Sequence, residues 1–139
     1  MAKNTQLTNL AVNTEANAFA ALFDSGFLDL FDGVQPATGD TAITTQNMLA
    51  SITFNATAFA SAANGVITAN PMTACSAATL TGNATWARCY ESNHTTAVMD
   101  VSVGTANTNV VLNSIAIQAN AQVSVSSFTH TVAKSTSGS

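Results

Sequence analysis

The sequence predicts a mainly β protein, an antiparallel β-sandwich or jelly roll with one short N-terminal α-helix. Two observations predict this fold class. From Phe27 onward, about seven or eight short segments with alternating or β-branched residues recur roughly every 8 to 14 residues, and Gly, Asn and Pro turns separate them. Only one segment has apolar residues at helical spacing, whereas a parallel α/β fold would need several helices.

A chain of 139 residues usually builds one hydrophobic core, so we expect a single domain. We expect an N-terminal arm over residues 1–12, a β-sandwich domain over 13–133, and a flexible tail rich in Ser, Thr and Gly over 134–139. In the arm, polar residues surround Leu7 and Leu10 too irregularly to indicate a helix or a strand.

The single helix is predicted after the arm. Asn13 or Thr14 can cap its N-terminus, and Glu15 lies in the first turn, where the helix dipole favours an anion. Gly26 supplies the stop signal. The apolar residues that recur at helical spacing are Ala16, Phe19, Leu22 and Phe23. Because this apolar stripe is narrow, we expect it to lie against a larger sheet.

The strands are predicted from alternation and from β-branched residues. Within residues 59–69, the pair Asn64-Gly65 favours a tight type I′ hairpin, since both residues tolerate positive φ. The segment 34–45 is interpreted as an ordered connection because Pro and Gly interrupt it. Predicted strands cover residues 27–31, 48–54, 84–91, 96–103, 110–117 and 122–132.

Charged side chains are scarce. Three Lys or Arg stand against seven Asp or Glu, which gives a formal net charge of −4 and a pI near 4.6, so we expect no nucleic-acid partner. The longest apolar run, residues 18–23, is far shorter than the about 20 residues that span a membrane, so we expect no membrane partner. No secretory signal is visible, so synthesis and folding are expected in the cytoplasm.

Metal and disulfide chemistry have little support in the sequence. Cys75 and Cys89 could form one disulfide, but two cysteines in a chain made in the cytoplasm are more often small buried hydrophobes. Neither lies in a C-x-x-C pair, and with only His94 and His130 beside them a zinc site lacks its ligand spacing. We therefore expect no cofactor.

Catalytic signatures are also weak, and we expect no enzyme. No Ser lies in a G-x-S-x-G turn, and both histidines are expected in solvated or hydrogen-bonded roles. The only local carboxylate cluster is Asp29, Asp32 and Asp40. Asp32 and Asp40 adjoin glycines, which fits turn hydrogen bonding better than the alternative of a calcium site. A hydrolase stays a third alternative because chance combinations of Ser, His and acid arise easily.

One predicted strand carries an unusual set of side chains. Trp86, Arg88 and Tyr90 share a face of it, since alternate residues of a strand point the same way. Such a face could be an aromatic platform for a sugar or for a cation. Core packing is the favoured interpretation of Trp86, because the chain holds one Trp and one Tyr only.

Four segments resemble a family of small structural proteins of tailed bacteriophages. The first is Phe31-Asp32-Gly33-Val34-Gln35-Pro36-Ala37-Thr38-Gly39-Asp40-Thr41-Ala42, and the others are Ala63-Asn64-Gly65-Val66-Ile67-Thr68-Ala69-Asn70, Gly82-Asn83-Ala84-Thr85-Trp86-Ala87-Arg88 and Asp100-Val101-Ser102-Val103-Gly104. The likeness covers most of residues 10–132 and includes no catalytic signature. It implies a virion component.

Within that resemblance, the expected function is capsid decoration: a cement protein on the outer surface of the virion shell, bound to the major capsid protein. We expect a homotrimer, because shells offer threefold positions, and an arm that reaches a neighbour through Asn4, Leu7 and Leu10. The alternative is a tail, neck or head-fibre module that binds a host-surface glycan through exposed Trp86 and Tyr90.

Overall fold

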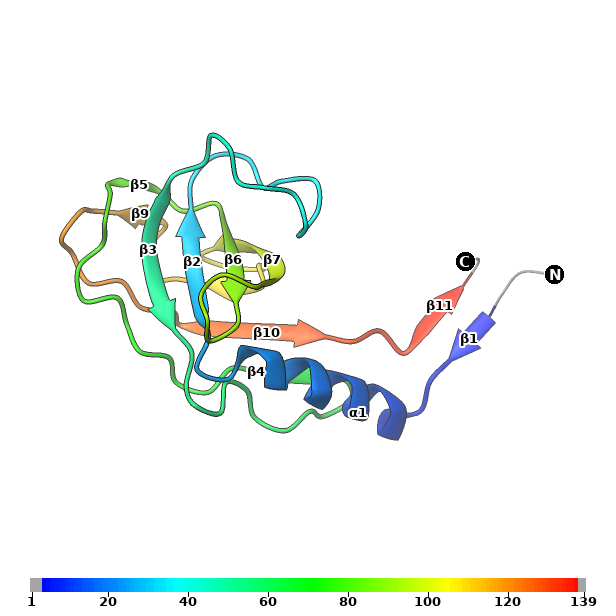
Figure 1. Ribbon diagram of the computed structural model, residues 1–139. Helices are drawn as coiled ribbons and strands as arrows, with labels where there is room; N and C mark the ends of the chain where they lie inside the picture. The colour runs from blue at the N-terminus through cyan, green and yellow to red at the C-terminus, as the bar shows by residue number, and fades with distance from the viewer. Residues whose placement is uncertain (1–3, 138–139) are drawn as a thin grey trace.

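The computed structural model describes residues 4–137 (Figure 1). Its helix α1 (Asn9–Ala20) continues as a 3-10 turn, η1 (Ala21–Phe23). The strands are β1 (Asn4–Gln6), β2 (Phe27–Phe31), β3 (Met48–Thr53), β4 (Val66–Thr68), β5 (Gly82–Asn83), β6 (Trp86–Tyr90), β7 (Ala97–Gly104), β8 (Val110–Val111), β9 (Ala116–Ile117), β10 (Ser127–Thr131) and β11 (Ser135–Ser137). The prediction of a mainly β protein with an N-terminal helix is confirmed.

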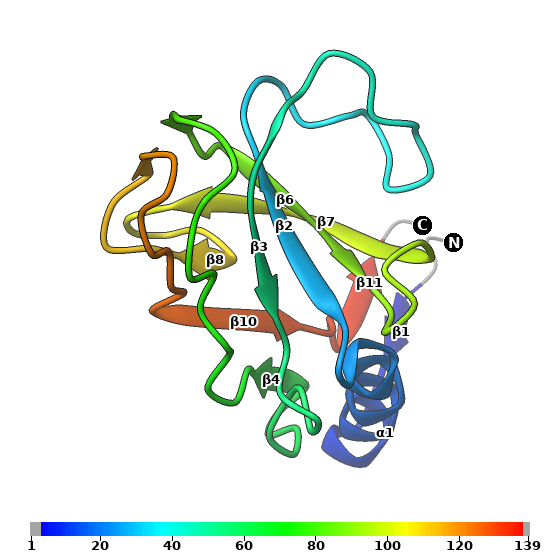
Figure 2. The ribbon, with the colours of Figure 1, turned by 60° about the vertical axis from the view of Figure 1, so that its left-hand side comes forward.

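Seven strands form one open sheet in the order β3-β2-β6-β7-β8-β10-β4. Neighbouring strands in it are antiparallel except for β7 and β8, which are parallel. Strands β2 and β3 cross the direction of β10 and β4 (Figure 2). Buried residues from both halves, such as Leu28 on β2 and Phe128 on β10, belong to one core. Two further pairs of strands, β5-β9 and β1-β11, form separate ribbons.

Helix α1 begins earlier than the sequence predicts. Thr8 caps it, because its Oγ1 accepts the N–H of Ala11 at 3.2 Å. The predicted cap Asn13 lies inside the helix, and its side chain instead accepts the backbone N–H of Gly65 at 2.8 Å. Asn13 therefore ties the helix to the hairpin before β4 rather than starting the helix.

The helix ends near the predicted stop, but for a different reason. Ser25, not Gly26, has the positive φ, of 56°. Gly26 lies against β6, where a Cβ atom would overlap the carbonyl oxygen of Tyr90. Glycine is therefore required at position 26 by close approach between backbones rather than by helix termination.

The predicted hairpin within residues 59–69 is confirmed. Asn64 and Gly65 have φ of 53° and 79°, as a type I′ turn requires. Ala63 and Val66 flank the turn and exchange backbone hydrogen bonds of 3.0 and 2.9 Å.

Two of the predicted strands are shorter or divided. The segment 110–117 splits into β8 and β9 because the chain changes partners within it. The N–H of Leu112 bonds to Gly104 of the large sheet, whereas the carbonyl of Ile115 accepts from Ala84 near β5, both at 2.9 Å. In 122–132 only β10 is a regular strand, and Val123 before it forms an isolated bridge to Cys75.

Helix α1 packs on the core through one narrow stripe, but the prediction of its residues is only partly right: Ala16 and Phe23 are buried, whereas Leu22 is 43% exposed. Val12, Ala16 and Ala20 are its buried residues, and Phe23 follows in the 3-10 turn. Phe23 contacts the rings of Phe54 and Phe59 in edge-on or tilted geometry, with centroids 5.4 and 5.3 Å apart. These aromatic contacts fix the C-terminal end of the helix against the large sheet.

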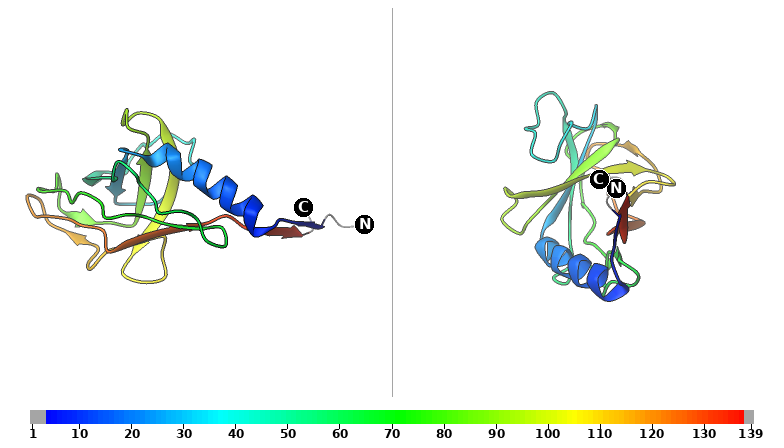
Figure 3. Two further views of the ribbon diagram at one scale, coloured as in Figure 1. Left: turned by 90° about the horizontal axis from the view of Figure 1, so that it is seen from below. Right: turned by 90° about the vertical axis from the view of Figure 1, so that its right-hand side faces the viewer.

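The two chain ends form a ribbon that projects from the body (Figure 3). β1 and β11 are antiparallel, with Gln6 opposite Ser135. The arm expected over residues 1–12 is therefore not the irregular segment that the sequence had suggested. Residues 4–6 form a strand and residues 9–12 belong to α1. The expected flexible tail likewise includes β11. The parts of both segments at residues 1–3 and 138–139 lie outside the described residues.

Within residues 4–137, no helix combines the length and the apolar character that a membrane crossing needs.

Candidate functional site

The outer face of the large sheet carries a row of polar side chains. Alternation on β2 turns Leu28 and Leu30 toward the core and Asp29 to the opposite face. Register places Asp29 opposite Ser51 of β3 and opposite Arg88 of β6. Arg88 in turn stands opposite Asp100 of β7, so the row crosses four strands; we call Ser51, Asp29, Arg88 and Asp100 the polar row.

Arg88 and Asp100 form a buried ion pair. Nε and one terminal nitrogen of Arg88 donate to the two carboxylate oxygens of Asp100 at 2.6 and 2.8 Å. The side chains are only 7% and 4% exposed. Arg88 also donates to the carbonyl of Thr41 at 2.7 Å, which holds the long connection after β2. The hydrogen bonds to Asp100 raise the pKa of Arg88.

Asp29 is held from two sides. Ser51 Oγ donates to it at 2.6 Å, and His94 Nε2 lies 3.0 and 2.9 Å from its two carboxylate oxygens. The His94 ring stacks on Phe27 with centroids 4.0 Å apart. His94 reaches this position from the β6–β7 turn with φ of 58°. These contacts hold the β6–β7 turn against the polar row at Asp29.

This Ser, Asp and His arrangement differs from an acyl-transfer triad. A triad needs the histidine between the acid and the nucleophile. Here Asp29 lies between Ser51 and His94, and Ser51 donates its proton to the carboxylate rather than to the imidazole. The geometry holds the carboxylate in place and does not activate Ser51.

An aromatic pair lies beside the polar row. Phe31 and Trp86 stack with ring centroids 4.6 Å apart, and Trp86 Nε1 donates to the carbonyl of Asp32 at 3.0 Å. Trp86 is 1% exposed. The alternative of an exposed platform at Trp86 is therefore wrong: Trp86 is buried, but against Phe31 and Arg88 on the outer face of the sheet and not in the main apolar core. Arg88 lies over the Trp86 ring at 5.6 Å, a cation–π contact inside the protein.

Asp32 and Asp40 have the turn roles expected of them only in part. Asp32 accepts the backbone N–H of Asn47 at 2.6 Å and its side-chain amide at 3.2 Å, which closes the base of the connection 33–46. These hydrogen bonds lower the pKa of Asp32. Asp40 receives no such bond at its carboxylate in the described structure, and its backbone N–H donates to Thr38 Oγ1.

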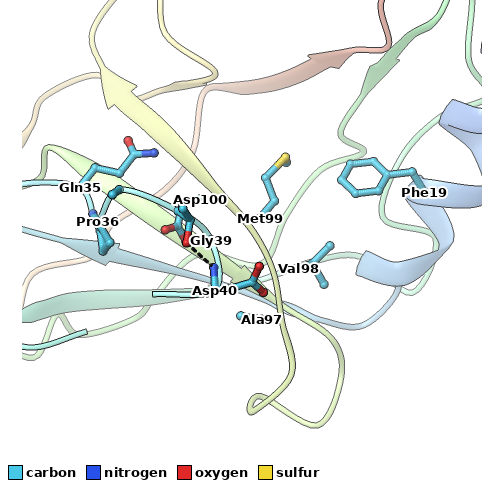
Figure 4. Close-up of a pocket in the computed structure, with 11 residues that line it drawn as sticks. Phe19, Gln35, Pro36, Gly39, Asp40, Ala97, Val98, Met99 and Asp100 are labelled. Carbon is cyan, nitrogen blue, oxygen red and sulfur yellow. Dashed lines mark hydrogen bonds between the residues drawn. The ribbon is translucent and has the colours of Figure 1, made fainter. Parts of the chain in front are cut away.

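A hollow of about 420 Å³ lies between that connection and β7 (Figure 4). The connection contributes Pro36, Gly39 and Asp40, and β7 contributes Val98 and Met99. Phe19 of α1 lines the hollow from the helix side. The hollow is open to solvent and is lined by apolar side chains and by Asp40, whose carboxylate forms no ion pair in the described structure.

The two cysteines are free thiols, so the disulfide considered above is not formed in this structure. Cys89 points into the core from β6, and burial raises the pKa of its thiol well above the usual range. Cys75 is partly exposed on a different loop, where its thiol donates to the carbonyl of Ala77 at 3.4 Å. His130 packs against Phe19, and desolvation lowers the pKa of its imidazole.

The predicted interface residues lie at the projecting end of the molecule. Asn4 is exposed in β1, and Leu7 is half-buried, its N–H bonded to the carbonyl of Lys134 at 2.7 Å. Leu10 lies in the first turn of α1 and is 78% exposed. The structure thus brings all three to the ribbon and its junction with the helix, on the solvent side.

Within residues 4–137, no group of three or more His, Cys, Asp or Glu side chains is placed to hold a metal ion. In the same part of the chain, every buried side-chain nitrogen or oxygen has a hydrogen-bond partner. The polar row therefore fastens loops to the sheet and offers no unsatisfied group to a ligand.

Ser51, Thr41 and Asp100 were missed in the sequence. The signal for Ser51 and Asp100 was present, since each is a polar residue between two apolar neighbours in a predicted strand. Their partners depend on strand register, which the sequence alone does not supply. Thr41 participates through its backbone carbonyl, which carries no residue-specific signal.

Comparisons of this chain with protein-family models, with curated proteins and with solved structures each found no significant match.

Proposed function

We propose that this chain is a structural virion protein of a tailed phage, a decoration or cement protein on the outside of the capsid shell. The major capsid protein is its partner, and a homotrimer is its working form. It is made in the host cytoplasm and acts on the finished virion surface. It needs no cofactor and works by adhesion rather than by catalysis.

The observation that carries this proposal is the projecting ribbon with Leu10 beside it. A two-stranded ribbon is marginally stable alone in water, so one that extends from the body favours contact with a neighbour. Leu10, at 78% exposure, offers an apolar anchor at its base. Arms of this kind suit a protein that bridges subunits.

The charge distribution supports adhesion as well. Three of the ten charged residues, Asp29, Arg88 and Asp100, are buried in the polar row. The surface therefore relies on Ser, Thr, Asn and Ala. Such side chains form a close interface without the desolvation penalty of several kcal/mol that each buried charge would add. Short side chains also lose little entropy on ordering.

The test is binding to undecorated shells of the phage that encodes this chain. Leu10→Asn should weaken binding roughly 10- to 100-fold, because burial of a Leu side chain contributes about 1.5 to 3 kcal/mol. Val34→Asn is the matched control, since Val34 is 81% exposed on the connection after β2. If wild-type protein does not bind shells, the proposal is contradicted. If Leu10→Asn and Val34→Asn weaken binding equally, the ribbon is not part of the contact with the shell.

The glycan-binding alternative loses its proposed platform. Trp86 is buried and Tyr90 is half-buried. Trp86→Ala is accordingly expected to destabilise the fold by about 3 to 5 kcal/mol rather than to abolish sugar binding in a folded protein.

We also propose that the sheet is a folded-over sandwich related to the jelly roll. The two halves of the seven-stranded sheet cross one another and share one core, which is the relation that two orthogonal layers have. The parallel β7-β8 pair at the bend is the feature that joins these halves into one sheet.

A further inference from the structure

The side of β7 away from β6 is largely unpaired. β6 accompanies β7 from Ala97 to Ser102, but β8 pairs only with Val103 and Gly104. Asn109 covers the next position, since its Oδ1 lies 3.4 Å from the backbone nitrogen of Ser102. The part of β7 before Ser102 therefore has no neighbouring strand on that side within the described sheet.

Asp100 exposes its backbone on this open side. Val103 donates to Thr85 beside β6, and the direction of backbone groups alternates along an antiparallel strand, so Val101 and Val103 point toward β6 and Asp100 points away. The Asp100 side chain is only 4% exposed, yet the residue as a whole is partly exposed. Its exposed atoms are therefore main-chain atoms, and they line the hollow beside β7, where Gly39 of the connection lies near the Asp100 backbone nitrogen.

The hollow combines three kinds of recognition. The Asp100 backbone supplies hydrogen-bonding groups, Phe19 and Val98 supply apolar surface, and Asp40 supplies a negative charge. The open stretch of β7 is short, because it lies between the start of the strand at Ala97 and the contact of Asn109 with Ser102. A short strand fits such an edge better than a long one.

The projecting ribbon has the complementary properties. β1 and β11 span three residues each, and each has an unpaired outer edge in the described structure. Among the residues that the structure describes, Lys134 beside β11 is the one cation outside the polar row, and its Nζ donates to Asn9 Oδ1 of the same chain at 2.8 Å; the remaining charges on the body are carboxylates.

The ribbon does not meet the hollow of its own chain. The ribbon joins α1 at Asn9, whereas Phe19 lies near the other end of the helix, about 15 Å away at 1.5 Å per residue. The ribbon also extends away from the body (Figure 3).

We propose that the β1/β11 ribbon of one copy docks into the hollow beside β7 of a second copy, with Lys134 facing Asp40. This inference rests on the proposed function, for which it names the contact between copies. Ribbon and hollow are different surfaces, so the contact is heterologous; such a contact gives a ring when the rotation between copies closes and a filament when it does not. A ring of three would be the expected trimer.

The test is a charge exchange read by sedimentation at several protein concentrations. Asp40→Lys and Lys134→Glu should each weaken self-association about tenfold, and the double variant should restore it. Gln122→Lys, which adds a positive charge on an exposed residue outside the hollow, is the control and should have no effect. Melting temperatures report whether each variant is folded.

A cysteine experiment gives an independent readout. In a Cys75→Ser background, copies with Gln6→Cys or Ser135→Cys are mixed with copies carrying Ala97→Cys and oxidised in air. A disulfide between the two kinds of copy supports docking and shows which strand adjoins β7. Its absence at both positions, or the lack of rescue by the double charge variant, overturns the inference.

Binding to shells separates this inference from the proposed function. A monomeric wild type that binds shells overturns the docking and the homotrimer, and it leaves standing the proposal that the chain binds the shell as a decoration protein. A ring that responds to the charge exchange but does not bind shells supports the docking and overturns the function.

Discussion

The two faces of β2 are both buried, but they achieve burial by opposite means. The inner face buries Leu28 and Leu30 against other apolar side chains. The outer face buries Asp29, which Ser51 and His94 satisfy. An apolar side chain tolerates any apolar neighbour of suitable size, whereas a buried charge needs one particular partner in one geometry. The outer face is therefore the more specific and the more vulnerable of the two.

The largest expected effect comes from breaking the ion pair on the outer face. Arg88→Leu leaves the Asp100 carboxylate buried without its partner and should lower the free energy of unfolding by about 3 to 5 kcal/mol, measured by urea denaturation. The double variant Arg88→Leu with Asp100→Leu is the control, and it should lose less than the single variant. A double variant at least as unstable as Arg88→Leu would contradict the comparison.

On the inner face, a substitution is expected to lower stability by leaving a cavity and not by leaving a charge without its partner. Leu28→Ala should lower the free energy of unfolding by about 2 to 5 kcal/mol, because it leaves a cavity in a fully buried site. Leu28→Met conserves volume and should lose less than about 1.5 kcal/mol. If Leu28→Met lowers the free energy of unfolding as much as Leu28→Ala does, the inner face is as specific as the outer one.

A smaller effect is expected where the polar row meets solvent. His94→Asn keeps a residue that tolerates positive φ but no longer reaches Asp29, and it should lower the free energy of unfolding by about 1.5 kcal/mol. A cycle with Asp29→Asn isolates the interaction. Additive losses in the two single variants would show that His94 and Asp29 are not coupled.

The smallest effect is a dependence on acid pH. Hydrogen bonds from Asn47 lower the pKa of Asp32 in the folded state below its ordinary 3.8, so the unfolded state binds more protons there. This contribution to stability is present above the ordinary pKa and is lost as the pH falls through the folded value. The melting temperature of Asp32→Asn should therefore fall less between pH 5 and pH 2 than that of wild type.

The sequence predicted what depends on local pattern. Alternation defined β2, and Asn64-Gly65 identified the hairpin before β4, because both signals lie within a few residues. It did not predict that 110–117 divides between two sheets, because that division follows from hydrogen bonds to distant segments. The start of α1 was also misplaced, since Asn13 is as good a cap as Thr8 until its bond to the hairpin is known.

On the outer face, the sequence identified single residues but not the row that they form together. Trp86, Arg88 and Tyr90 were assigned to one side of a strand, which is correct. Their relation to Asp29 and Asp100 depends on register across β2, β6 and β7, including a shift between Cys89 and Tyr90. A shift of one residue would turn every one of these side chains to the other face, so no local pattern could have fixed the row.

The pairing of β1 with β11 also sets an order of events in folding. These strands lie at opposite ends of the chain, so closing the loop between them before the body exists would cost the most chain entropy of any pairing in the molecule. The ribbon should consequently assemble last and open first. Native-state hydrogen exchange would report this at the amide of Leu7, which should exchange by local opening while amides within β6 await global unfolding.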